Sequence, residues 1–198
     1  MTQKFSENRS DRWADWAVIG TLVVALLLGA AVMTLAQGQH SQYTSAEAGL
    51  TVSYPQNWLL KSADDLAFQA VDPESSDFKT AYQVRVTPIV ANTPTTSTLT
   101  LALSNLSLTR AQQEIAYRQL EINEGPAIDG QPAREATYVY VVKGNDLFVQ
   151  RMPAIVQGLD IAVARGGRAY IFSLLAAKDT FPGAETAFRR FVASAEIK

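Results

Sequence analysis

The sequence predicts an α+β fold: a central antiparallel sheet covered by helices, preceded by a single N-terminal transmembrane helix. Three observations lead to this class. Several segments alternate apolar and polar residues with a period of two, which is typical of half-buried strands. Only two segments after residue 46 show helical spacing, and they lie far apart in the chain, as expected for helices that cover a sheet. Residues 16–36 form an uncharged, apolar run.

The run from Trp16 to Ala36 contains 21 residues and no charged side chain. A helix of about 20 apolar residues spans the hydrocarbon core of a bilayer. Three basic residues precede the run, Lys4, Arg9 and Arg12, whereas the next Lys or Arg along the chain is Lys61. Because positive charge stays on the cytoplasmic side, we expect a single-pass protein of the cell membrane with a cytoplasmic N-terminus and an extracytoplasmic C-terminal domain.

The predicted organisation is a short cytoplasmic tail at 1–15, a transmembrane helix at 16–36, a polar stalk at 37–45 and one extracytoplasmic domain at 46–198. A cleaved signal peptide is the alternative, because small residues precede a possible cleavage site after Ala36. The apolar run is longer than the roughly 7–15 residues of a signal-peptide core, which favours an uncleaved signal anchor. The chain has no cysteine, which excludes a lipoprotein anchor.

Small residues recur every four positions along the predicted membrane helix: Ala17, Thr21, Ala25 and Gly29. Such a strip allows a second helix to approach closely, although small residues are common in membrane helices in general. We interpret it as a packing face for a partner in the membrane. Trp13 and Trp16 are predicted anchors at the inner headgroup level, where amphipathic rings settle.

Composition excludes several classes of function. Residues 37–198 carry 14 Lys and Arg against 16 Asp and Glu, a balance that argues against a nucleic-acid partner. The absence of cysteine removes disulfides, thiol nucleophiles and thiolate metal sites. His40 is the single histidine, so a common zinc site or a Ser-His-Asp triad has no basis. We therefore predict no catalytic residue, no metal and no cofactor, and we expect the protein not to be an enzyme.

Alternating or apolar segments predict five strands before residue 150: Leu50–Tyr54, Leu66–Val71, Tyr82–Val90, Tyr117–Ile122 and Glu135–Val142. A turn is expected at 125–130, and Phe148–Gln150 is a possible short strand. Two helices are predicted. The first covers Leu99–Gln113, with leucines at helical spacing. The second covers Pro182–Ser194, where an apolar stripe of Phe188, Phe191 and Val192 leaves Arg189 and Arg190 pointing away.

Residues 155–176 predict a β-hairpin about Gly166-Gly167, because both positions of a two-residue turn can adopt positive φ. The register places three apolar pairs on one face, which must face the core: Val163–Tyr170, Ile161–Phe172 and Leu159–Leu174. The opposite face is more mixed, with Asp160 opposite Ser173. We expect that face to be less deeply covered.

The segment that opens the domain resembles the start of PsbP-like domains, the superfamily of the photosystem II extrinsic subunit. Residues 49–58 read GLTVSYPQNW, and the chain ends with a long hairpin and a helix that closes on FVASAEI at 191–197. The resemblance covers about Tyr43–Lys198. The resemblance implies an α/β/α sandwich with a central antiparallel sheet. It also implies that the protein is not an enzyme but an accessory subunit that docks on a large assembly. The uncleaved anchor departs from the photosystem subunit, which is soluble and extrinsic.

Four further features of the sequence are candidate sites. Five acidic residues fall within 14 positions: Asp64, Asp65, Asp72, Glu74 and Asp77. They could hold a hard cation, but the spacing matches no EF-hand loop, and a solvated acidic loop is the preferred interpretation. Arg165, Arg168, Arg189 and Arg190 could form a basic patch or be ordinary surface charge. Trp58 is expected to pack under the sheet edge rather than face a partner. Ser173 and Lys178 have no spacing that would bring them together for hydrolysis.

The leading hypothesis is a non-catalytic, membrane-anchored accessory subunit whose extracytoplasmic domain docks on or stabilises a larger membrane protein complex. Its expected partners are subunits of that complex and the lipid bilayer, without nucleic acid. The alternative is a membrane-tethered binding domain for a lipid or other small ligand, which needs an open pocket beside the sheet. A filled core between Ile161, Phe172 and Phe188 would remove that alternative, and a hydrolase is a distant third.

Overall fold

The computed structural model describes residues 16, 18–29, 39–75, 78–89, 95–143 and 153–198. It divides the chain into two units, residues 1–40 and residues 41–198.

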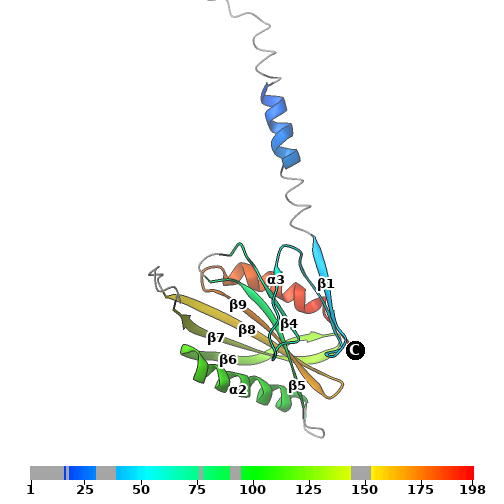
Figure 1. The fold of residues 1–198 in the computed structure, drawn as a ribbon, viewed down its shortest axis with the longest axis vertical. Helices are drawn as coiled ribbons and strands as arrows, with labels where there is room; N and C mark the ends of the chain where they lie inside the picture. The colour runs from blue at the N-terminus through cyan, green and yellow to red at the C-terminus, as the bar shows by residue number, and fades with distance from the viewer. Residues whose placement is uncertain (1–15, 17, 30–38, 76–77, 90–94, 144–152) are drawn as a thin grey trace, which may run out of the picture. The chain divides into compact units, whose positions relative to one another are not determined.

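The second unit is built on a seven-stranded antiparallel sheet with the strand order β3-β4-β5-β9-β8-β7-β6 (Figure 1). Its strands are β3 (Leu59–Leu60), β4 (Phe68–Val71), β5 (Ala81–Pro88), β6 (Ile115–Ile128), β7 (Gln131–Val142), β8 (Ala154–Arg165) and β9 (Arg168–Ala177). A smaller sheet has the order β1-β2-β10, with β1 (His40–Ser45), β2 (Leu50–Pro55) and β10 (Glu196–Ile197). These antiparallel sheets confirm the predicted α+β class.

The β8–β9 hairpin has the predicted register. Arg165 pairs with Arg168 across a turn in which Gly166 and Gly167 have φ values of +57° and +75°. A side chain at either position would be strained, because L-residues rarely adopt this left-handed region. The three predicted apolar pairs are all present in the ladder and face the core.

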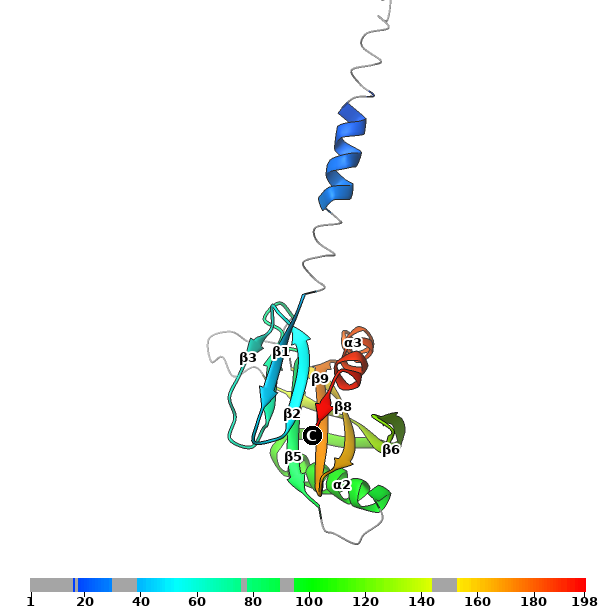
Figure 2. The same cartoon turned by 90° about the vertical axis from the view of Figure 1, so that its right-hand side faces the viewer.

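Helix α3 (Phe181–Ala193) and the small sheet cover one face of the large sheet (Figure 2). Phe191 lies at the centre of this core, with its ring centroid 5.6 Å from Phe68, 4.8 Å from Tyr82 and 6.2 Å from Phe172. Such aromatic clusters bury large apolar areas and favour tilted or offset geometries. The predicted helix therefore forms with its apolar stripe inward.

Helix α2 (Thr95–Gln113) covers the opposite face, over β6 to β9, through the buried residues Leu99 and Leu103. This layer corrects one expectation. The hairpin face that carries Asp160 and Ser173 is as deeply buried as the other face. The mixed composition of that face reflects a polar group on α2 that reaches the sheet, and not exposure to water.

Several element boundaries differ from the prediction. Residues 40–45, predicted as part of a stalk, form strand β1, which pairs with β2 and packs Tyr43 on Phe68 with ring centroids 5.2 Å apart. The turn expected at 125–130 is confined to Asp129 and Gly130, since β6 runs to Ile128. The possible strand at 148–150 lies outside the described residues.

In the first unit, residues 18–29 are helical, and all of these side chains are exposed. No helix within the described ranges combines the length and the apolar character needed to cross a membrane. Of the predicted membrane residues, Thr21, Ala25 and Gly29 belong to this helical stretch and Trp16 is exposed, whereas Trp13 and Ala17 lie outside the described residues.

Candidate functional site

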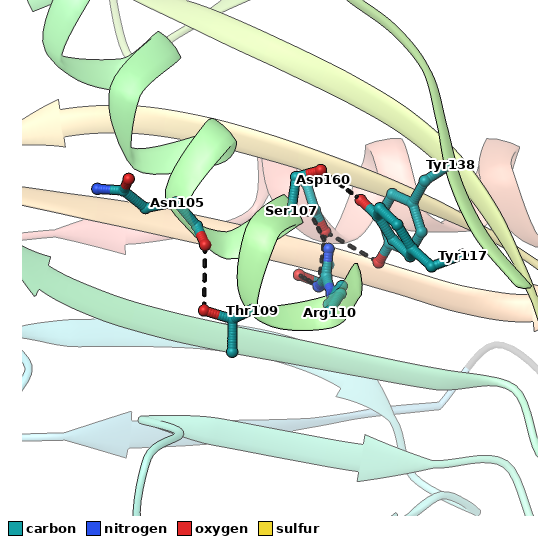
Figure 3. Close-up of polar contacts among 8 residues, drawn as sticks. Asn105, Ser107, Thr109, Arg110, Tyr117, Tyr138 and Asp160 are labelled. Atoms are coloured by element: carbon teal, nitrogen blue, oxygen red, sulfur yellow. Dashed lines mark hydrogen bonds and ion pairs between the residues drawn. The ribbon is translucent and has the colours of Figure 1, made fainter. Parts of the chain in front are cut away.

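The principal polar feature of the folded unit is an ion pair buried between α2 and the large sheet. Arg110, in the last turn of α2, reaches the middle of β8 and pairs with Asp160 through both terminal nitrogens of its guanidinium (Figure 3). Arg110 Nη2 donates to Asp160 Oδ1 at 3.2 Å and to Ser173 Oγ at 3.3 Å. Asp160 is only 2% exposed. Burying this carboxylate is tolerable because the geometry is bidentate and further donors surround it.

Tyr138 of β7 completes the network. Its hydroxyl donates to Asp160 Oδ1 at 3.2 Å, and the guanidinium carbon of Arg110 lies 4.3 Å from its ring centroid. The ring can lie flat because its cross-strand neighbour on β8 is Gly158. A Cβ at that position would be 2.2 Å from Tyr138 Cζ. The glycine therefore makes room for the cation–π contact and for the third hydrogen bond to Asp160.

Electrostatics hold these groups in fixed protonation states. Burial disfavours the charge on Arg110, but Asp160 offsets it, so the pKa of Arg110 is above its ordinary value. Burial raises the pKa of Tyr138 well above 10, and the charge of Asp160 raises it further. The guanidinium thus stays charged and the phenol stays neutral at physiological pH. A proton-transfer role would require a group that titrates there.

A second hydrogen bond joins the end of α2 to the sheet edge. Tyr117 Oη of β6 donates to Ser107 Oγ at 2.9 Å (Figure 3). Burial raises the pKa of Tyr117, although the hydrogen bond with Ser107 opposes that shift. Within the helix, Thr109 Oγ1 donates to the Asn105 carbonyl at 3.1 Å. The C-terminal half of α2 is therefore attached to β6, β7, β8 and β9 by specific polar contacts.

A groove of about 740 Å³ runs between α2 and β5, where the helix stops covering the sheet. Ile171 and Leu175 contribute apolar surface, Gln83 and Asn105 contribute amides, and Arg110 reaches its edge. This volume falls within the range of small-molecule sites. Another hollow, of about 690 Å³, lies beside residues 126–129 and the end of α3. Both are open clefts on the surface of the sandwich.

Three of the four candidate arginines, Arg165, Arg168 and Arg189, are held by ion pairs or hydrogen bonds, and Arg190 is exposed on α3. Arg165 pairs with Asp129 at the hairpin end. Arg189 donates to Glu135 of β7 at 3.0 Å and to Glu185 at 2.8 Å. The expectation that Arg189 points away from the body is therefore wrong, because its guanidinium links α3 to the sheet.

The predicted acidic group disperses over the loops around β4. Asp65 pairs with Arg85 at 2.6 Å, and Asp72 accepts the backbone N–H of Glu74 at 2.9 Å, while Asp77 lies outside the described residues. In the part of the chain that the structure describes, no three His, Cys, Asp or Glu side chains lie close enough together to hold a metal.

Trp58 packs on Tyr82 at a centroid distance of 4.4 Å, which confirms its predicted position under the sheet edge. Ser173 is buried against Arg110, and Lys178 is exposed, so the structure does not bring this pair together.

Sequence reasoning missed the network around Arg110. Two signals in the sequence point to it. Arg110 is the one charged residue of an otherwise neutral helix, and Asp160 is the one acidic residue inside an apolar strand. One charge in a neutral helix and one acidic residue in the interior of an apolar strand indicate that the two charges meet.

Comparison with known proteins finds likeness at the level of structure. No protein-family model and no curated protein matches the sequence. The cyanobacterial PsbP (CyanoP) of Synechocystis sp. PCC 6803 superimposes with a TM-score of 0.61 at 16% identity, over 80% of this chain and 92% of that one.

Two further solved structures share the architecture. The Ran-binding protein Mog1p of Saccharomyces cerevisiae gives a TM-score of 0.51 at 8% identity, over 80% of this chain and 95% of that one. LpqN, involved in cell envelope biogenesis of Mycobacterium tuberculosis, gives 0.51 at 12% identity, over 81% and 91%. At these identities the likeness concerns the fold. The folded unit therefore has a PsbP-like fold, as the resemblance of its first residues predicted.

Proposed function

We propose that this chain is a non-catalytic accessory protein, tethered to the cell membrane by residues 16–36, whose extracytoplasmic folded unit docks on a larger membrane protein complex. Membrane attachment is supported by the uncharged run of 21 residues that precedes the folded unit in the sequence. Its helical part exposes apolar side chains all round, such as Leu26 and Leu27. A helix that continues over all of residues 16–36 would be long enough to span a bilayer and unfavourable in water.

The docking role is supported by the chemistry of the folded unit. The Arg110–Asp160 pair is satisfied by partners inside the protein and joins the layers of the fold. One protein of similar fold, Mog1p, is named as a Ran-binding protein. The proposal transfers to this chain only the general role of binding another protein.

Membrane attachment is tested by extraction and labelling. Alkaline carbonate should leave the full chain in the membrane and release a version that begins at residue 41. Because the chain has no cysteine, single variants Ser6→Cys and Lys198→Cys report orientation. A membrane-impermeant maleimide applied to spheroplasts should label Lys198→Cys alone. Release of the full chain by carbonate, or labelling of Ser6→Cys, would contradict the proposal.

Docking is tested by purifying the full chain in mild detergent and separating it by native electrophoresis. We expect a species larger than the chain, with co-purifying membrane proteins. Gly29→Leu should weaken that assembly, because a larger side chain separates helices that pack through small residues. Leu27→Ile, on another face, should leave it intact. Migration as an isolated chain in wild type would refute docking, and an unchanged complex in Gly29→Leu would refute the packing face.

Ligand binding is a second candidate, favoured by the groove between α2 and β5. A ligand pocket inside the sandwich is excluded, because Ile161, Phe172 and Phe188 fill the core. A fluorescent fatty acid is a suitable probe of the groove. Ala102→Trp would fill it, whereas Gln112→Trp, exposed on the same helix, would not. Saturable binding lost only in Ala102→Trp supports this function, and equal binding by both variants rejects it.

A further inference from the structure

The solvent-facing side of α2 carries no charge. Arg110 is the single charged residue among the 19 of this helix, and it is buried against Asp160. The exposed positions are all neutral: Thr95, Ser97, Leu101, Asn105, Leu108, Thr109, Ala111, Gln112 and Gln113. By contrast, the shorter helix α3 carries Glu185, Arg189 and Arg190. Depletion of charge together with exposed leucines is typical of the centre of a protein interface.

The outward residues of α2 also follow a heptad pattern. Ser97, Leu101, Ser104, Leu108 and Ala111 are spaced alternately by four and three residues. Leu101 and Leu108 are 60% and 64% exposed, although they are large and apolar. This spacing is the seam by which one helix packs on another, and the small residues between the leucines leave holes for leucine knobs. The stripe that α2 uses within its own unit, Leu99 and Leu103, is a different one.

We propose that the α2 seam pairs with the α2 seam of a second copy of this chain, antiparallel, about a two-fold axis near Ser104. A two-fold contact uses the same surface on both copies, so each seam must supply both knobs and holes. Leu101 and Leu108 lie about 10 Å apart along the axis, so antiparallel pairing places Leu101 of one copy opposite Leu108 of the other. Neither α2 brings a charged side chain of its seam to the contact, Arg134 of β7 lies beside Ser104, and the two helix dipoles oppose each other favourably.

The neutral chemistry of the seam selects this occupant. A partner with a charged face would have to strip water from its charges without gaining a counter-charge from α2. Of the two helices that the structure describes after residue 41, α3 has its apolar stripe buried against the sheet, whereas α2 has an uncommitted seam. A single helix pair is a small interface, so we expect a reversible, concentration-dependent dimer.

Disulfide cross-linking of the full chain in its membrane tests the pairing, because the sequence has no native cysteine. Co-expressed Leu101→Cys and Leu108→Cys chains should form a covalent dimer in mild oxidant, severalfold more than either variant by itself. Lys178→Cys, an exposed position away from α2, controls for random collision. Cross-linking no greater than in Lys178→Cys overturns the proposal. More dimer from Leu101→Cys alone than from the mixture overturns the antiparallel arrangement.

A second measurement separates this contact from association through the membrane segment. Leu101→Ser combined with Leu108→Ser should convert the residues 41–198 unit, which has its own core, from dimer to monomer in sedimentation equilibrium. Leu59→Ser removes a leucine that is similarly exposed, at 57%, and should leave the dimer intact. A wild-type unit that remains monomeric at high concentration, or a dimer that survives both serines, contradicts the proposal. Carbonate extraction of the full chain tests membrane attachment separately, so failure of the dimer does not bear on the proposed membrane anchor.

Discussion

At the scale of single residues, Gly158 decides whether the polar network can form. Gly158→Ala would place a methyl group where Tyr138 now lies, 2.2 Å from its Cζ atom. We expect the free energy of unfolding to fall by about 1–3 kcal/mol, as overpacking commonly costs. Urea unfolding of the 41–198 unit measures this. Tyr138→Ala removes the clashing ring, so the double variant should be less destabilised than the sum of the single variants. Additive effects would show that the clash is relieved in another way.

Buried tyrosines make stability fall at alkaline pH. Burial raises the pKa of Tyr140, the charge of Glu114 adds to this, and burial likewise raises the pKa of Tyr82 and Tyr138. In the unfolded chain these phenols ionise near pH 10. The stabilisation is therefore complete below pH 10 and is lost as pH rises toward the folded-state pKa, because the unfolded chain then binds fewer protons.

The expected slope above pH 10 is about 1.4 kcal/mol per pH unit for each such tyrosine. Urea unfolding between pH 8 and pH 11 measures it. Tyr140→Phe should reduce the slope by about 1.4 kcal/mol per pH unit, the contribution of one tyrosine, without altering the Asp160 network. An unchanged slope in Tyr140→Phe would mean that this phenol is not protected by folding.

At the scale of elements, two glycines of similar exposure should respond in opposite ways to alanine. Gly167→Ala forces a methyl side chain into the left-handed region at φ +75° and should cost about 1–2 kcal/mol. Gly183→Ala lies in the first turn of α3 with open space around it and should stabilise by about 0.4–1 kcal/mol. Thermal unfolding of both variants beside wild type measures the contrast. Equal shifts would refute the conformational explanation.

Elements set by local chemistry could be predicted, and contacts between layers could not. A two-residue turn fixes its own register, so Gly166-Gly167 determined the β8–β9 pairing from sequence alone. The Arg110–Asp160 contact joins residues 50 positions apart across two layers, and no local pattern specifies such a meeting. The same limit explains why the Asp160 face was expected to be less covered. The membrane helix and its packing face remain predictions.

At the scale of the whole molecule, the last four residues close the fold. Strand β10 pairs with β2, and Ala195 and Ile197 are buried in the main core. Deletion of residues 195–198 should lower the free energy of unfolding by about 2–3 kcal/mol, mainly from the lost burial of Ile197. Lys198→Ala keeps the strand and should change stability by less than about 0.5 kcal/mol. Thermal unfolding compares the two, and a deletion as mild as Lys198→Ala would show that β10 adds little.

The same small sheet determines how the folded unit responds to force. The chain enters β1 at His40, turns tightly into β2, and returns beside β2 as β10, so that Lys198 ends next to Gly49. β1 and β10 therefore run in the same direction on either side of β2, and the chain enters and leaves at opposite ends of this sheet. A pull between these two ends loads its hydrogen bonds in shear, so they must break together. They cannot peel apart one at a time.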